Sequence, residues 1–124
     1  MEKLIFDLKL QDFILLPGFV ANPEQFYNLF DLFVLTSDYE GFGNVVLEAL
    51  SYGLRIVSTD CPSGPREILE DGKWGALVPM NDVFALTRAM ENALASEKII
   101  YCDEYLDKFS IDEIGNRYIK ILSN

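Results

Sequence analysis

Short apolar runs alternate along the chain with segments whose apolar residues recur at helical spacing. The runs are continuous rather than alternating, which is typical of strands that are buried on both faces of a parallel sheet. We predict strands at residues 13–16, 32–35, 55–58 and about 75–78. The alternation of strand and helix indicates an α/β fold with a parallel sheet and right-handed crossovers.

Sequence signals at the ends of the intervening segments predict the helices. Residues 1–10 predict a short helix, and Asn22 followed by Pro23 places a cap and a first-turn proline ahead of the second. A third helix is expected to end at Gly53, and a fourth to begin at Pro65.

Beyond residue 79 the pattern is wholly helical. A long helix is expected with Asn81 or Asp82 as its cap, followed by a looser segment at about residues 99–106. Ser110 and Glu113 then form a capping box for a final helix.

Composition limits the classes of function. A chain of 124 residues is one domain, and half of its residues are hydrophobic. No apolar run approaches the ~20 residues that span a bilayer, and no leader opens the chain, so we expect a cytoplasmic protein. The net charge of −10 argues against nucleic acid and against anionic lipid as partners.

The chain has no histidine, which excludes a Ser-His-Asp triad, an imidazole base and the usual zinc ligands from it. Cys61 and Cys102 are too few for a disulfide framework. We therefore interpret both as buried or idle thiols.

The stretch 40–48 carries the candidate chemistry. It follows the predicted strand 32–35 and opens a helix, which is the layout of a phosphate-accepting βα junction. Gly41 and Gly43 have no Cβ, so backbone amides there can approach a ligand closely. Asn44 is a good N-cap, which would leave the amides of the first helical turn pointing outward.

Two carboxylates flank these glycines. Glu40 and Glu48 would repel a phosphate, but ionised carboxylates accept hydrogen bonds from hydroxyl groups and can hold a sugar diol. Amides for a diphosphate, combined with acids for two sets of hydroxyls, describe a site for a nucleotide sugar.

Two glutamates separated by seven residues, with glycines after the first and a helix carrying the second, resemble the donor-site motif of glycosyltransferase family 4. The stretches 35–37, 48–57 and 60–69 are also similar to this family, in the same order. The resemblance implies retaining enzymes with the GT-B fold, in which two Rossmann-like domains face each other across a cleft. The alternative is an ordinary helix start whose acids cap it and are solvated.

The resemblance also implies a role for each residue of the motif. Glu40 would be the catalytic residue beside the transferred sugar, and the alternative is a solvated loop acid. Glu48 would hold the ribose diol, and the alternative is an acid on the helix surface. Val45 would pack under the ribose or belong to the core. Backbone amides for the diphosphate and sugar would come from Gly41, Phe42, Gly43 and Asn44.

Residues outside the motif have weaker assignments. Phe19 and Val20 follow the first predicted strand, where the family often uses backbone groups to contact the base. Arg66 could reach an anion, although pairing with Glu67 or Glu70 is favoured. Trp74 is expected to belong to the core rather than to stack against a ligand.

No metal is expected. Asp38 and Glu40 superficially resemble the acid pair of the other main glycosyltransferase fold, but their spacing and context disagree with it. Retaining GT-B enzymes of the implied type need no metal, so we expect no cofactor and a UDP-sugar as substrate.

The resemblance covers about residues 4–122. It makes 1–124 a single partial Rossmann-like nucleotide-sugar-binding domain, with a core at 12–96 and C-terminal helices at 97–124. Family members have two further strands upstream, with bases that hold the donor phosphates, and an N-terminal acceptor-binding domain. Tyr118 and its helix would cross toward that domain.

Without those upstream strands, the run 13–16 would be orphaned, re-paired, or paired with another copy of the chain, giving a homo-oligomer through the incomplete sheet edge. The implied function is transfer of a hexose or N-acetylhexosamine from a UDP-sugar to a glycan or lipid-linked acceptor, in polysaccharide biosynthesis. We expect the full-length enzyme to associate with membranes and this chain alone to be inactive. The rival interpretation is a catalytically inactive fragment or subunit that acts as a binding or assembly module.

Overall fold

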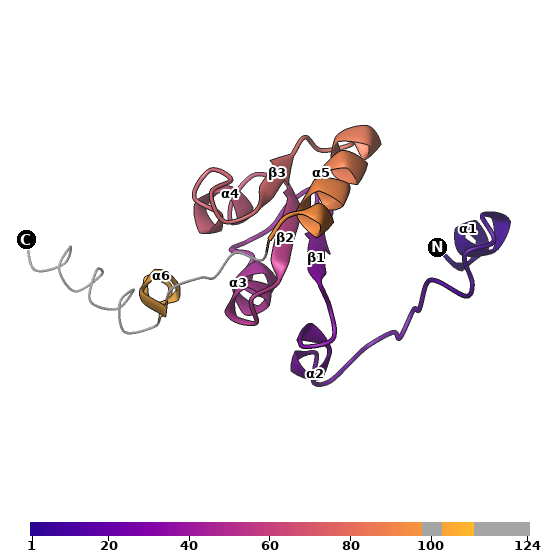
Figure 1. The fold of residues 1–124 in the computed structure, drawn as a ribbon, viewed down its shortest axis with the longest axis horizontal. Coiled ribbons are helices and arrows are strands. Elements are labelled where there is room, and N and C mark those ends of the chain that lie inside the picture. Colours follow the sequence, from indigo (N-terminus) through magenta and orange to yellow (C-terminus); the bar gives the residue numbers. More distant parts are fainter. Residues whose placement is uncertain (98–102, 111–124) are drawn as a thin grey trace, which may run out of the picture.

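The computed structural model describes residues 1–97 and 103–110. At its centre is a three-stranded parallel sheet in the order β1-β2-β3 (Figure 1). The strands are β1 (Leu32–Leu35), β2 (Arg55–Thr59) and β3 (Ala76–Val78). In register, Val34 lies opposite Val57, and Val57 lies opposite Ala76. Three of the predicted strands and the parallel α/β class are therefore confirmed.

Helices cover both faces of this sheet. Figure 1 shows α5 on one side and α3 with α4 on the other, while α1 stands apart at the end of an extended connection. The helices are α1 (Glu2–Asp7), α2 (Glu24–Tyr27), α3 (Asn44–Ser51), α4 (Pro65–Ile68), α5 (Val83–Ala95) and α6 (Asp103–Asp107). The final helix expected after Ser110 lies outside the described residues, as do Cys102 and Tyr118.

The main core lies between the sheet and the side of α3 and α4. Its buried members come from α2, α3, β2, α4 and α6 or from residues directly next to them, and are Tyr27, Val46, Ala49, Leu50, Leu54, Ile56, Ile68, Leu69 and Tyr105. Trp74 packs against this cluster, as predicted. Val57 and Val78 alternate with the cluster-facing residues along their strands and therefore face α5. Cys61 is buried, as expected.

Two predicted caps are resolved by the structure. Asp82, rather than Asn81, caps α5, because its carboxylate accepts a hydrogen bond of 2.8 Å from the amide of Ala85. The prediction for α2 was wrong by one residue. Pro23 itself is the N-cap, with φ −66° and ψ −21°, and Asn22 lies outside the helix.

The predicted strand at 13–16 is wrong. The amides of Phe13 and Ile14 both donate to the carbonyl of Leu10, so the start of this run continues the turn after α1. These local hydrogen bonds compete with a ladder, and β1 keeps an unpaired outer edge among the described residues. Phe13 and Leu15 are 82% and 79% exposed. The run is orphaned, and its pairing with another copy stays a prediction.

Glu70 joins two separate parts of the chain, the loop between α4 and β3 and the end of α6. Its carboxylate accepts hydrogen bonds from Lys108 at 2.8 Å, Lys73 at 3.0 Å and the indole of Trp74 at 2.9 Å. The hydrogen bonds from Lys108 and Lys73 lower the pKa of Glu70 from an ordinary 4.5 to about 2. This contact network holds α6 against the loop that leads to β3.

An exposed apolar run and an open sheet edge in the same chain predict self-association. We expect Phe13→Lys to reduce any concentration-dependent dimerisation measured by sedimentation velocity, because a charge at this position opposes burial of the run. Phe84→Lys is the matched control, since Phe84 is similarly exposed, at 86%, but belongs to α5 and not to the run 13–16. Equal effects of the two substitutions would contradict pairing through residues 13–16.

The lowered pKa of Glu70 predicts that the stability of the fold depends on pH. A carboxylate with a lowered pKa in the folded state stabilises the fold above its unfolded pKa and loses this effect as the pH falls. The free energy of unfolding should therefore decrease as the pH falls from about 4.5 to about 2. Denaturant titrations of Glu70→Gln should show a smaller decrease in the free energy of unfolding over this pH range. Glu67 is an exposed neighbour, so Glu67→Gln should show the same decrease as the wild type.

Candidate functional site

The turn between β1 and α3 is built on a glycine in the left-handed region. Gly43 has φ 84° and ψ 38° and is the N-cap of α3, so the prediction of Asn44 as N-cap was wrong by one residue. A residue with a Cβ is strained in this conformation, whereas glycine adopts it freely. Because glycine has no side chain, no N-cap side chain accepts from the first-turn amides. The amide of Val46 donates to the carbonyl of Gly43 at 2.8 Å, so the amides suited to an anion are those of Asn44 and Val45.

Glu40 is held by Ser37, which is itself fixed by a residue at the end of β2. Its carboxylate accepts a hydrogen bond of 2.6 Å from the hydroxyl of Ser37, just beyond β1. The carbonyl of Ser37 accepts in turn from the hydroxyl of Thr59, also at 2.6 Å, at the end of β2. The partly buried Glu40 side chain therefore has a defined position relative to the sheet.

Glu48 lies on the exposed side of α3 and is oriented from α2. Its carboxylate accepts a hydrogen bond of 3.0 Å from the hydroxyl of Tyr27. Tyr27 is only 7% exposed and belongs to the core, so its hydroxyl has a fixed position. The sequence interpretation missed Tyr27 and also Ser37. The spacing of Ser37 three residues before Glu40 is the one signal that could have indicated either contact.

The other residues of the motif differ in their surroundings. Gly41 has open space where a Cβ would lie. The ring of Phe42 packs against the ring of Phe109, with 6.1 Å between the two ring centroids. Val45 is 38% exposed, so it is not a core residue, which removes the alternative left open for it.

Phe19 and Val20 lie on the connection between α1 and α2, which Figure 1 shows leading away from the sheet toward α1. Phe19 is 95% exposed and Val20 is partly buried. Phe19 is therefore not packed against the β1–α3 turn, and the structure does not gather it with the other predicted site residues.

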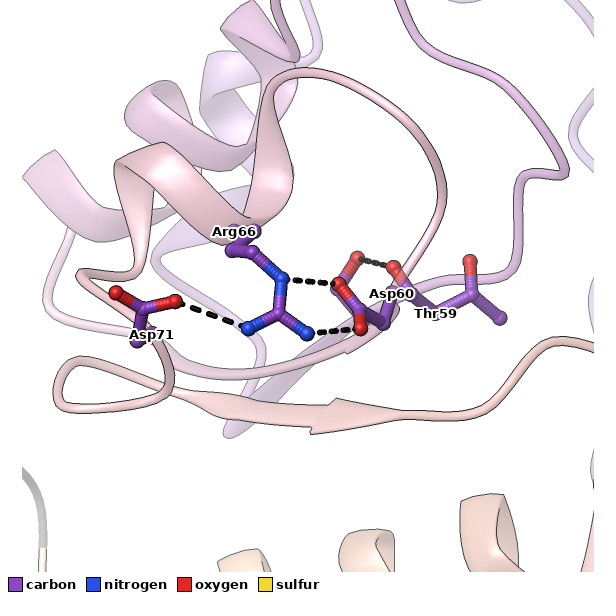
Figure 2. A network of polar contacts seen from close by, with 5 residues as sticks. Thr59, Asp60, Arg66 and Asp71 are labelled. Atoms are coloured by element: carbon purple, nitrogen blue, oxygen red, sulfur yellow. Dashed lines mark hydrogen bonds and ion pairs between the residues drawn. The ribbon is translucent and has the colours of Figure 1, made fainter.

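Arg66 lies at the junction between β2 and α4, and the partners predicted for it were wrong. Figure 2 shows its guanidinium between Asp60 and Asp71, rather than paired with Glu67 or Glu70. Nε donates to Asp60 at 3.0 Å, Nη1 donates to Asp71 at 2.9 Å, and Nη2 also contacts Asp60. Hydrogen bonds with Asp60 and then Asp71 raise the pKa of Arg66 above its ordinary value. Its charge is already engaged by two carboxylates.

A small cavity of about 180 Å³ opens where the three strands end. Its lining includes Asp38 and Thr59 but neither Glu40 nor Glu48. Within residues 1–97 and 103–110, no group of three or more acidic or cysteine side chains is placed to hold a metal ion. None of the helices in this same part of the chain is both long enough and apolar enough to cross a membrane.

A parallel sheet with helices on both faces, whose glycine-capped helix begins at the carboxyl end of a strand, places the protein among α/β folds that bind ligands at this edge. Comparison with known proteins identifies the family. The family described as glycosyl transferases group 1 matches residues 1–96, and the chain belongs to it.

Relatives of known sequence agree with this assignment. An uncharacterized glycosyltransferase of Methanocaldococcus jannaschii is 34% identical over 95% of this chain and 32% of its own length. A Campylobacter jejuni enzyme is 33% identical over 77% of this chain and 26% of its own. That enzyme is named N-acetylgalactosamine-N,N'-diacetylbacillosaminyl-diphospho-undecaprenol 4-alpha-N-acetylgalactosaminyltransferase. The chain thus spans about a third of the length of the curated relatives that it matches.

Solved structures confirm the fold as that of GT-B glycosyltransferases. One is a variant of S. aureus TarM in complex with fondaparinux, alpha-GlcNAc-glycerol and UDP. It superposes with a TM-score of 0.80 at 23% identity, over 99% of this chain and 26% of that chain.

The left-handed glycine at the head of α3 gives a direct test of this turn. Gly43→Ala should lower the free energy of unfolding by about 1–2 kcal/mol, the cost of this conformation for a residue with a Cβ. Gly41→Ala, where no Cβ contact and no positive φ arises, should change it by less than about 0.5 kcal/mol. Urea titrations of both variants measure the difference, and equal stabilities would contradict the described turn.

Proposed function

We propose that this chain provides the nucleotide-sugar donor site of a retaining glycosyltransferase. The donor would be a UDP-sugar, and a hexose or N-acetylhexosamine would pass to a glycan or lipid-linked acceptor. Membership of glycosyl transferases group 1 supports the reaction class. The name of the C. jejuni relative supports an N-acetylhexosamine and a lipid-linked acceptor, and UDP was present with TarM.

The observation that carries this proposal is the geometry of the β1–α3 turn. Gly43 heads α3 at the carboxyl end of β1, with no side chain capping the first-turn amides. These amides and the positive end of the helix dipole would receive the donor diphosphate, which is the leaving group of the reaction. The contact needs backbone groups only, so Gly41, Phe42, Gly43 and Asn44 would contribute through their amides.

The two glutamates would recognise the hydroxyl groups of the donor. Glu48 would accept from the ribose diol, and the hydrogen bond from Tyr27 supports this role because it fixes the carboxylate on the exposed side of α3. Glu40 would lie beside the transferred sugar and support positive charge that develops at the anomeric carbon. Its hydrogen bond from Ser37 would set the direction of the carboxylate.

Charge sets a limit on this site. From residue 1 to 54 the only basic side chains are Lys3 and Lys9, both near α1, and Arg66 is engaged by two acids. Hydrogen bonds that involve a charged donor are roughly twice as strong as neutral ones. We therefore expect weak UDP binding and no transfer by this chain alone, with the acceptor site and further bases lying in other parts of such enzymes. A lipid-linked acceptor would place the reaction at the cytoplasmic face of a membrane.

An assembly module is the second candidate. The exposed run 13–16 and the outer edge of β1, which is unpaired among the described residues, favour it, because such surfaces promote association between chains. The two candidates differ in whether the chain binds UDP.

Calorimetric titration with UDP tests the proposal. Wild-type chain should bind, and Glu48→Gln should lose at least about tenfold in affinity, because the neutral amide is a weaker acceptor for the ribose hydroxyls. Tyr27→Phe should lose less, since it removes only the group that orients Glu48.

Glu91→Gln is the control, an exposed glutamate on α5. No binding at millimolar UDP would overturn the donor-site proposal and favour the assembly module. An equal loss of affinity in Glu91→Gln would exclude Glu48 as a specific contact.

A further inference from the structure

The loop between β2 and α4 makes an unusually close backbone contact with the β1–α3 turn. Gly64 has φ 78° and ψ −82°, a conformation suited to glycine. A Cβ on Gly64 would lie 2.5 Å from the carbonyl oxygen of Phe42 and 2.8 Å from its carbonyl carbon. Both are backbone atoms, so neither could move without moving the turn itself.

A second contact lies one residue further along the same turn. The Cβ position of Gly43 is 3.4 Å from Cδ1 of Ile68 and 3.9 Å from Cδ of Pro65, both in α4. Pro65 and Ile68 are fully buried, so this surface has little freedom to adjust. Two successive residues of the turn, Phe42 and Gly43, therefore pack against the loop and against α4.

The loop itself is fixed at both ends. The amide of Asp60 donates to the carbonyl of Val78 at 2.8 Å, which ties the start of the loop to the end of β3. Arg66 then holds the carboxylate of Asp60 from the first turn of α4, as Figure 2 shows. At the other end of α4, the hydroxyl of Tyr105 donates to the carbonyl of Ile68.

We propose that the loop 60–64 acts as a buttress that sets the direction of the amides at residues 42–44, with Gly64 as a positioning residue. Gly64 would not touch the donor. It would act through Phe42 and Gly43, whose backbone it contacts, and this role rests on the proposed function of the turn. A side chain at position 64 would displace the turn and misdirect its amides.

The test compares Gly64→Ala with Gly53→Ala. Gly53 also has a left-handed φ, of +70°, but nothing lies within 4 Å of its Cβ position. Both variants place alanine at a positive φ, which strains the backbone, and only the first also has the steric conflict with the turn. Amide chemical shifts without ligand should change at residues 42–44 in Gly64→Ala and stay unchanged there in Gly53→Ala.

UDP affinity is the second readout. Because displaced amides would form poorer hydrogen bonds to the diphosphate, each worth about 1.5–3 kcal/mol with a charged partner, Gly64→Ala should lose at least about tenfold in affinity. Gly53→Ala should stay within about twofold, as expected for an independent site. If the wild-type chain binds no UDP, the donor-site proposal fails, while the shifts of residues 42–44 still decide whether the loop positions the turn.

A milder variant keeps the test decisive if Gly64→Ala does not fold. Ile68→Val removes Cδ1, which lies 3.4 Å from the Cβ position of Gly43, and keeps the rest of the side chain. The amide of Gly43 should then shift, and UDP affinity should fall. Unchanged amide shifts at residues 42–44 in a variant that folds would show that the loop does not support the turn. Shifted amides with unchanged UDP affinity would show that Gly64 is not a positioning residue for the donor.

Discussion

The structure depends on the burial of β2. This strand pairs on both sides, with β1 and β3, and its residues from Ile56 to Thr59 are at most 6% exposed. Helices α3 and α5 contact it from the two faces of the sheet. At its carboxyl end, Thr59 fixes the carbonyl of Ser37, and the loop to α4 leaves from the next residue. Both segments that form the candidate site are thereby positioned by the most buried strand.

Two kinds of group with opposite electrical character meet in this site. The amides at the head of α3 favour negative charge, whereas Glu40 and Glu48 carry it. The basic residue at the junction between β2 and α4, Arg66, is shared between Asp60 and Asp71 and offers little further attraction. If the site binds a nucleotide sugar as proposed, the two carboxylates make recognition of its hydroxyl groups the selective part of binding. Tight hold on the phosphates would need cations from elsewhere in the enzyme.

The sequence predicted the strands of the sheet because continuous apolar runs of this length bury well between two layers. It failed at 13–16, where the same pattern occurs but the amides bond locally to Leu10. Periodicity does not reveal whether a partner edge lies within reach. Asn44 was preferred as cap on propensity, yet the turn required the left-handed conformation of Gly43. The hydrogen bond from Tyr27 to Glu48 joins residues 21 positions apart, so no local sequence pattern indicates it.

A crystal structure of the chain with UDP tests most directly whether the turn and its two acids serve one ligand. The account predicts the diphosphate against the amides at the head of α3 and the ribose hydroxyls on the carboxylate of Glu48. Glu40 should then lie on the side where the sugar would continue. UDP bound elsewhere, such as the cavity beside β3 that is lined by Arg55 and Trp74, would contradict the account.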